Sequence, residues 1–315
     1  MNNAASLKKH RSNSSLGARM YKYRWFYVMF VPVLVFLIIF HYMPMAGIRF
    51  AFTTFKLGKT ASYIGLNNFA RLFNMPKFWG AFSNTLELSI IKLLLNTFMS
   101  VIASLMLNEV INLRFKKTAQ TIIYLPHFLS WVVTASVFQM ILAPTASGLV
   151  NQFLLQTGIS SESIYFLGSS KWWRASYFII NIWKDTGWGT IIFMATLTGI
   201  DPGIYEAASI DGAGRFRKMR HITLPALANT IITVLILNLA KVMNLFESTF
   251  VLQNDAVMDQ AQVLQTYVYY QTFNSGGIPD YGYTTAISLF SSIVGMILVL
   301  VCNQASKKVR GRGII

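Results

Sequence analysis

The sequence predicts an all-α, polytopic membrane protein with six transmembrane helices and both termini in the cytoplasm. Hydrophobic residues make up 54% of the 315 residues and charged residues only 12%, whereas soluble domains carry roughly 25% charged residues. Apolar runs of about twenty residues recur along the chain, and each is long enough to cross the roughly 30 Å hydrocarbon layer as a helix. Basic residues gather between these runs, as the positive-inside rule describes.

The six apolar runs define a predicted transmembrane domain that covers residues 25–303. They lie at residues 25–46, 84–107, 120–143, 174–198, 224–247 and 283–303. The first run follows a basic segment, as a signal peptide would, but it ends in YMPMAG without an A-x-A-like cleavage site. We therefore interpret it as a retained first span.

Four basic clusters fall on one side of this arrangement. They precede the first run, separate the second run from the third and the fourth from the fifth, and follow the sixth run. This pattern predicts a cytoplasmic N-terminal segment (residues 1–24) and a cytoplasmic C-terminal tail (residues 304–315). It also explains the net charge of +16 without a nucleic-acid partner.

Catalytic, metal and cofactor sites are not expected in this chain. The single cysteine, Cys302, excludes an internal disulfide, and the four histidines are scattered without an HExxH pattern. No GxSxG nucleophile motif is present. The LGKT string at residues 57–60 is similar to the end of a P-loop, but threonine stands at position 53 where the motif requires glycine.

The segment between the fourth and fifth runs, residues 201–225, predicts a helix–turn–helix elbow on the cytoplasmic surface. Asp201 is a suitable N-cap, and Pro202 fits the first turn of a helix. Gly212 and Gly214 interrupt this helix before a short basic one follows. Two interpretations stay open on physical grounds: a helix that lies in a groove of another protein, or a positive-inside loop before a Pro-marked helix start.

The elbow resembles the EAA loop of binding-protein-dependent ATP-binding-cassette (ABC) permeases. The residues that match in order and spacing are Glu206, Ala207, Ala208, Asp211, Gly212, Ala213, Ile222, Leu224 and Pro225. The resemblance implies that the elbow is a coupling helix that docks into an ATPase subunit. It also implies two ATP-binding subunits that hold ATP and magnesium, a second permease subunit, and an extracellular solute-binding protein.

Flanking segments extend the resemblance to carbohydrate permeases. FHYMPMAGIRFAF, IIYLPHFLSWVV and LQTYVYYQTFNSGGIPDYGY are similar to the branch that transports oligosaccharides and polysaccharides. The resemblance implies that this chain lies in a bacterial cell membrane and forms half of a carbohydrate pathway that works by alternating access.

Ionisable side chains within the spans mark a predicted solute pathway, because such groups usually face a cavity or a partner. The pathway residues are Asn181, Lys184, Asp185, Trp188, Asn238, Lys241 and Asn244. In the fourth span the spacing i, i+4, i+7 places Asn181, Asp185 and Trp188 on one helix face. In the fifth span Asn238, Lys241 and Leu245 repeat that helical geometry, with Asn244 beside them. Amides and charges suit sugar hydroxyls, and an indole suits the apolar face of a pyranose. The alternative is that these groups satisfy one another or the partner permease, for instance through an ion pair of Asp185 with Lys184 or Lys241.

Two further transporter classes stay open. A secondary transporter would use Lys92, Asp185 or Glu87 as a proton relay and would need no ATPase. An ABC permease could also carry a solute other than a sugar. The sequence does not name the sugar, although Lys184 and Lys241 would suit an acidic saccharide.

Overall fold

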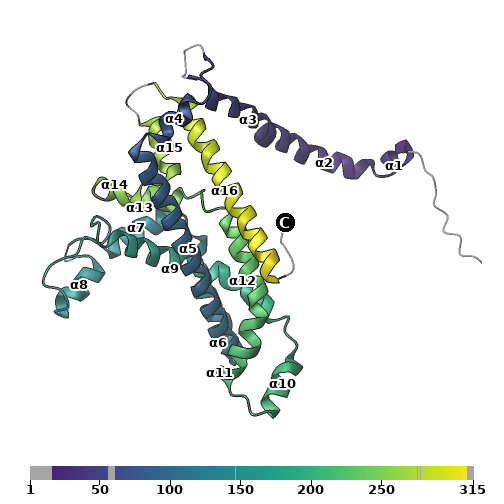
Figure 1. Ribbon diagram of the computed structural model, residues 1–315. Helices are drawn as coiled ribbons and strands as arrows, with labels where there is room; N and C mark the ends of the chain where they lie inside the picture. The colour runs from purple at the N-terminus through teal and green to yellow at the C-terminus, as the bar shows by residue number, and fades with distance from the viewer. Residues whose placement is uncertain (1–15, 56–60, 146, 275, 277, 311–315) are drawn as a thin grey trace, which may run out of the picture. The chain divides into compact units, whose positions relative to one another are not determined.

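The computed structural model describes residues 16–55, 61–145, 147–274, 276 and 278–310. Within this part of the chain the regular structure is helical apart from one isolated antiparallel bridge between Thr53 and Tyr63 (Figure 1). The all-α prediction is therefore confirmed. The LGKT string at residues 57–60, and the basic residues before position 16 and after position 310, lie outside the described residues. The chain divides into two compact units, Met1–Phe50 and Ala51–Ile315.

The first unit is a succession of helical segments. They are α1 (Leu16–Lys22), α2 (Arg24–Leu37), a π-helical turn (Ile38–Tyr42), α3 (Met43–Met45) and a 3₁₀ segment (Ala46–Phe52) that runs across the unit boundary. The helical run Arg24–Phe52 is 29 residues long and apolar enough to cross a membrane. It contains the predicted first span.

The second unit contains the remaining helices, whose bounds follow in chain order. They are α4 (Asn67–Phe73), α5 (Pro76–Glu109), α6 (Leu113–Tyr124), α7 (Trp131–Ile141), α8 (Leu149–Gln156), α9 (Trp173–Leu197), α10 (Pro202–Ile210), α11 (Arg215–Lys218), α12 (Leu224–Leu239), α13 (Glu247–Leu252), α14 (Met258–Ala261), α15 (Leu264–Phe273) and α16 (Tyr281–Arg310). Short 3₁₀ turns at Leu125–Phe128 and Asp255–Val257 and a π-helical turn at Met219–Thr223 join some of them.

Four helices in the described part of the chain are long and apolar enough to cross a membrane. They are Arg24–Phe52, Pro76–Glu109, Arg215–Leu239 and Tyr281–Lys308, and a bent pair (Leu113–Phe128 with Trp131–Ile141) would be a fifth. Helix α9 has 25 residues, which is enough length, but it carries Arg174, Lys184 and Asp185 and is less apolar. The count of six spans and the cytoplasmic termini stay predictions.

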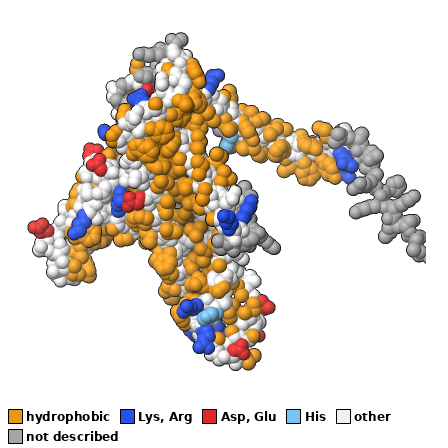
Figure 2. Space-filling model, viewed as in Figure 1, with side chains coloured by type: hydrophobic (Ala, Val, Ile, Leu, Met, Phe, Trp, Pro, Cys, Tyr) orange, Lys and Arg blue, Asp and Glu red, His pale blue; other side chains and the backbone are white. Residues whose placement is uncertain are grey.

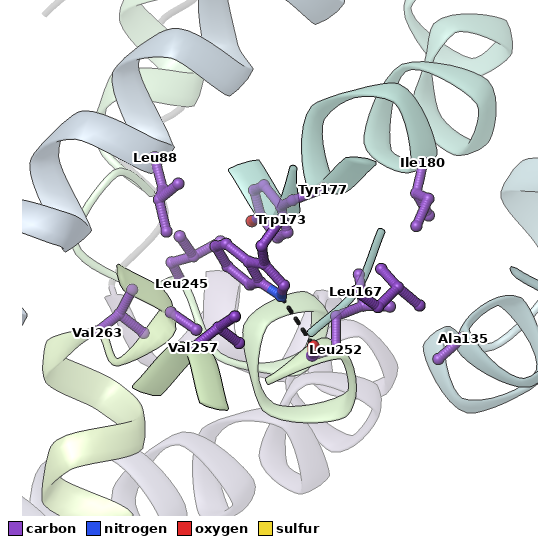
Figure 3. Packing of buried hydrophobic residues seen from close by; sticks show 11 residues of the cluster. Leu88, Ala135, Leu167, Trp173, Tyr177, Ile180, Leu245, Leu252, Val257 and Val263 are labelled. Atoms are coloured by element: carbon purple, nitrogen blue, oxygen red, sulfur yellow. Dashed lines mark hydrogen bonds between the residues drawn. The ribbon is translucent and has the colours of Figure 1, made fainter. Parts of the chain in front are cut away.

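Helix α9 lies at the centre of the second unit. Its most extensive packing is against α5, and it also contacts α6, α12 and the turn Leu125–Phe128. At its N-terminal end Trp173 and Tyr177 stack at 5.2 Å and are fully buried. The Trp173 indole Nε1 donates to the carbonyl of Leu252 at 2.9 Å, which ties α13 to α9 (Figure 3).

The third predicted span is broken rather than continuous. The run 120–143 becomes α6 with its 3₁₀ turn and then α7, which meet at an angle of 104°. Leu129 is extended at the break, and Ser130 caps α7 by accepting from the backbone N–H of Val133. Pro126 lies in the last turn before the break, where its ring disfavours a regular helix. The run was expected to form one helix, and the structure divides it into two.

The helix found at the fifth predicted span, 224–247, both begins and ends earlier in the chain than predicted. The helical run starts at Arg215 and α12 ends at Leu239, after which residues 240–243 form a turn. Turn bonds from Lys241 N to Asn238 O and from Asn244 N to Lys241 O replace the helical ladder. Ser89 of α5 donates to the carbonyl of Val242 at 2.7 Å, so a carbonyl freed by the break is satisfied inside the protein.

Candidate solute cavity and cytoplasmic elbow

A cavity of about 420 Å³ lies between α5, α9, α12 and the turn that follows α12. Its walls combine cationic, anionic, amide and indole side chains. The polar and aromatic side chains among its lining residues are Ser89, Lys92, Asn96, Thr97, Ser100, His127, Asp185, Trp188, Phe193, Asn238, Lys241 and Asn244.

Five of the seven predicted pathway residues line this cavity: Asp185, Trp188, Asn238, Lys241 and Asn244. For α9 the predicted i, i+3 relation of Asp185 and Trp188 is present on a regular helix. For the fifth span the predicted helix geometry was wrong, because Lys241 and Asn244 follow the end of α12. They reach the cavity from the turn instead.

Asn181 and Lys184 lie elsewhere. Asn181 is fully buried and donates to the carbonyl of Tyr177 at 2.7 Å within α9. Neither residue is among those that line the cavity.

Lys184 binds backbone carbonyls at the break in the third span. Its ammonium is buried and donates to the carbonyls of Pro126 at 3.4 Å, His127 at 3.1 Å and Leu129. It also lies 5.4 Å from the centre of the Trp131 ring. A helix end leaves backbone carbonyls short of donors, and an ammonium with three donors can supply them. The Pro126 carbonyl also accepts from the backbone N–H of Leu129 at 3.2 Å, so Lys184 matters most for the carbonyls of His127 and Leu129. Lys184 is thus a structural cation at this break, and it forms no ion pair with Asp185.

Asp185 is instead the centre of an ion-pair cluster in the cavity wall. Its carboxylate lies 3.8 Å from Lys92 Nζ and 3.4 Å from His127 Nδ1. The His127 ring stacks on the indole of Trp188 at 4.8 Å with an interplanar angle of 14°. The three charged or titratable groups come from α9, α5 and the turn before the break, so this cluster joins three segments of the chain.

Sequence reasoning missed His127 and left Lys92 out of the pathway. Lys92 carried a usable signal, since it is a charge inside a predicted span. His127 carried a weaker one, an ionisable ring beside Pro126 within the third apolar run. The scattered positions of the histidines concealed it, because only the fold brings His127 to Asp185.

Two glycines allow the close packing of α9 around this cluster. A Cβ at Gly187 would lie 2.1 Å from the carbonyl oxygen of Ile123 in α6, and a Cβ at Gly189 would lie 2.3 Å from the Ser100 hydroxyl of α5. The Ser100 hydroxyl donates to the carbonyl of Thr186 at 3.0 Å. Glycine at both positions therefore brings α5 and α6 onto α9.

Glu87 belongs to a different network from Asp185. It pairs with Arg174, whose guanidinium also donates to Asn84 at 3.1 Å. Asn84 in turn donates to the carbonyl of Asp259 at 2.8 Å. Of the three groups considered for a proton relay, the structure brings together only Lys92 and Asp185.

The elbow, residues 201–225, has the predicted helix–turn–helix form. The Asp201 carboxylate caps α10 by accepting from Gly203 N at 2.9 Å. After α10 the chain turns at Gly212, whose φ of +75° is a conformation that residues with a Cβ rarely adopt. The Ala213 N–H reaches back to the carbonyl of Ala208 at 2.9 Å, which closes the turn.

The elbow presents apolar and charged side chains together. Ile204, Ile210 and Phe216 are 49%, 87% and 70% exposed, and Glu206, Ala207 and Asp211 are also exposed. Tyr205 contacts the hydroxyl of Thr223 at 3.0 Å and ties α10 to the start of α12. Charged side chains gather at this end of the second unit, beyond the mostly hydrophobic surface of the long helices (Figure 2). The elbow is therefore attached to α12 through a defined contact.

Residues 97–311 match the family described as the binding-protein-dependent transport system inner membrane component. The match includes the elbow and most of the cavity. This chain belongs to that family. It is a multi-pass, helical ABC permease of the importer type, and family members work with a second permease and with ATPase subunits. The predicted resemblance is confirmed, and the roles of individual elbow and cavity residues stay predictions.

Relatives and solved structures are similar along nearly the whole chain. The polygalacturonan/rhamnogalacturonan transport system permease protein YteP of Bacillus subtilis (strain 168) is 38% identical over 314 residues, which are 98% of this chain and 96% of that protein. Protein LplB of the same organism is 39% identical over 295 residues, with 92% and 91% covered. A chain of the bacterial alginate ABC transporter in complex with an alginate pentasaccharide-bound periplasmic protein has a TM-score of 0.86 at 33% identity, with 96% of this chain and 100% of that chain covered.

Proposed function

We propose that this chain forms half of the translocation pathway of an ABC importer for acidic oligosaccharides or polysaccharide fragments in a bacterial cytoplasmic membrane. A second permease forms the other half. Two ATP-binding subunits bind ATP and magnesium, and an extracellular binding protein delivers the solute. The observation that carries the proposal is the cavity, which combines lysines, amides and an indole.

The cavity chemistry fits a sugar acid. Asn96, Asn238 and Asn244 offer amides for hydroxyl groups, and Trp188, which is 51% exposed, offers a ring for the apolar face of a pyranose. Lys92 and Lys241 offer ammonium groups for carboxylates. The names of the relatives support this class, because YteP is a polygalacturonan/rhamnogalacturonan permease and a similar transporter imports the acidic polysaccharide alginate.

The mechanism we propose is alternating access. ATP-driven closure of the ATPases moves the elbow, and the elbow is continuous with α12, which carries Asn238 into the cavity. The contact of Tyr205 with Thr223 makes α10 and the start of α12 move together. Closure therefore opens the cavity outward, and ATP hydrolysis returns it inward. No covalent chemistry takes place in this chain.

Purification from the native membrane in mild detergent, followed by mass spectrometry, tests the assembly. We expect a second permease and an ATP-binding subunit to co-purify with this chain. Recovery of the chain alone, active in proton-driven uptake after reconstitution, would replace the importer proposal with a secondary transporter.

Uptake by the reconstituted complex tests the solute class. We expect Lys241→Met to lower ATP-dependent uptake of a galacturonate trisaccharide about tenfold, because a charge-assisted contact is lost. Lys77→Met is the matched control, since Lys77 is exposed near the start of α5 and does not line the cavity. Equal uptake by the two variants would contradict the proposed role of the cavity. Preference of the native complex for neutral trisaccharides would contradict the acidic class.

A further inference from the structure

Two of the charged side chains that line the cavity, Lys92 and Asp185, are paired with each other. Asp185 is the only carboxylate among the residues that line the cavity, all of which are described, and it lies 3.8 Å from Lys92. Both side chains are partly exposed, 22% for Lys92 and 25% for Asp185, so the pair faces the cavity rather than the interior of the helix bundle.

This arrangement is a poor fit to a simple anion site. A site built only to attract a carboxylate would leave its lysine without a nearby anion, because an anion within about 4 Å offsets much of the attraction for a second one. Here Lys92 has an anionic partner from the protein itself, while Lys241, which also lines the cavity, has no ion pair among the described residues.

We propose that Asp185 is an internal counter-ion that occupies Lys92 until a carboxylate of the solute takes its place. This inference rests on the proposed function, since it requires an acidic solute. Binding then exchanges one ion pair for another: the solute carboxylate pairs with Lys92, and Asp185 retains His127, which lies 3.4 Å from its other oxygen.

The second partner of Asp185 makes the exchange possible. A carboxylate released from its only cation in a cavity within the membrane would be left unpaired at high cost. His127 lies against Asp185 and is held in orientation by its stack on Trp188. Lys184, the residue before Asp185, donates to the carbonyl of His127 at 3.1 Å. This contact holds the backbone at His127 in place. The buried Nδ1 of His127 has no hydrogen-bond partner among the described residues and lies 3.4 Å from Asp185, so it can pair with the carboxylate when Lys92 is released.

Counter-ion exchange gives the cavity selectivity. A small inorganic anion would form an ion pair with Lys92 but would break the pair of Lys92 with Asp185. Its net attraction to the site is therefore small. An oligouronate breaks the same pair but also contacts Lys241, the amides and the indole of Trp188. The exchange also keeps binding weak enough for release, which a transport site requires.

A measurement of oligosaccharide binding to the purified importer tests this inference separately from the proposed function. The complex of this chain with its permease and ATPase partners is placed in nanodiscs without the binding protein, whose own affinity would dominate. The probes are radiolabelled trigalacturonate and its methyl-esterified form, which has the same rings without charge. Inorganic sulfate serves as the small-anion competitor.

We expect Asp185→Asn to bind trigalacturonate about tenfold more tightly than the native complex, because the competing anion is gone. Binding of the methyl ester should change less than about twofold, and sulfate should compete only in the variant. Glu109→Gln, which removes an exposed carboxylate at the end of α5, should leave all three measurements unchanged.

A second comparison does not depend on the folding of the Asp185 variant. Lys92→Met should weaken trigalacturonate binding more than Lys241→Met does, because it removes a cation and also leaves Asp185 to repel the solute. Weaker binding of both probes to Asp185→Asn, or equal losses in the two lysine variants, would overturn the inference alone. A native complex that prefers the methyl ester would overturn the proposed solute class together with the inference.

Discussion

The elbow and the charged centre of α9 are both polar regions of a largely apolar chain, but they are built from different kinds of contact. In the elbow the contacts are local: Asp201 caps its own helix, and Tyr205 reaches Thr223 only 18 positions away. At the centre, Lys184 reaches carbonyls 55 to 58 positions away. The elbow is exposed to a partner, whereas Lys184 is enclosed by the fold. Substitutions at the centre should therefore affect folding first, and those in the elbow should affect coupling first.

Lys184→Met gives the sharpest test of the structural half of this comparison. The carbonyls of His127 and Leu129 would lose the ammonium, while the Pro126 carbonyl keeps the backbone N–H of Leu129. We expect a loss of stability of about 2–5 kcal/mol. The apparent melting temperature of the purified protein in detergent measures this effect. Lys92→Met is the control, because Lys92 is more exposed and contributes one ion pair.

Lys184→Arg should recover part of the loss, since a guanidinium retains several donors. Equal melting temperatures for Lys184→Met and Lys92→Met would show that the break is held by other contacts.

The glycines of α9 offer a second test of the packed centre. At Gly187 an added Cβ meets the backbone of α6 at 2.1 Å, whereas at Gly189 it meets the Ser100 hydroxyl at 2.3 Å, which can rotate away, and the Ser100 Cβ at 2.8 Å, which needs only a small shift. We expect Gly187→Ala to cost about 1–3 kcal/mol through overpacking and Gly189→Ala to cost less. Thermal unfolding of the two variants checks the order, and the reverse order would contradict the close approach of α6 to α9.

Gly212 and Gly214 form a matched pair in the elbow. Both have open space at the Cβ position, but only Gly212 has a positive φ, so Gly212→Ala should cost about 1 kcal/mol locally and Gly214→Ala should not. We expect Gly212→Ala to lower co-purification of the ATPase while the melting temperature of the permease changes little. A fall in melting temperature as large as that of Lys184→Met would contradict the proposed difference between the two regions.

Asp201→Ala should have the smallest effect. Loss of the N-cap of α10 costs about 1 kcal/mol in an exposed helix, so the elbow should fray without unfolding. ATPase stimulation by solute should fall slightly in the reconstituted complex. Asp201→Asn is the control, because asparagine is also a good N-cap. If asparagine impairs stimulation as much as alanine does, the carboxylate has a role beyond capping.

The difference between local contacts in the elbow and distant contacts at the centre of α9 also determines what could be predicted from the sequence. The elbow depends on a cap, a glycine turn and a proline within one segment, so its form could be read from residues 201–225. The cavity depends on distant segments, and only the fold gives the adjacent residues Lys184 and Asp185 different roles. His127 could not be placed without the break that follows Pro126, since periodicity alone predicts a straight span there.

The end of α12 illustrates the same limit. The apolar run continues past Leu239, and hydropathy cannot show that the Val242 carbonyl finds a donor in Ser89 on another helix. Lys241 was predicted in the pathway from a helical spacing to Asn238 that is absent, and Asn244 because it lies beside these residues. They line the cavity because the turn after α12 carries them there.

Thiol labelling of the cavity tests the central claim, that the solute passes between α5, α9 and α12. The chain has one cysteine, so Cys302→Ser gives a thiol-free background. In it, Asn238→Cys places a thiol in the cavity wall, and Lys77→Cys places one at an exposed position near the start of α5 that does not line the cavity. In the reconstituted complex we expect trigalacturonate to slow labelling of Asn238→Cys by a charged thiol reagent several-fold and to leave labelling of Lys77→Cys unchanged. Equal labelling rates with and without trigalacturonate at Asn238→Cys, in a complex that still transports it, would contradict a pathway through this cavity.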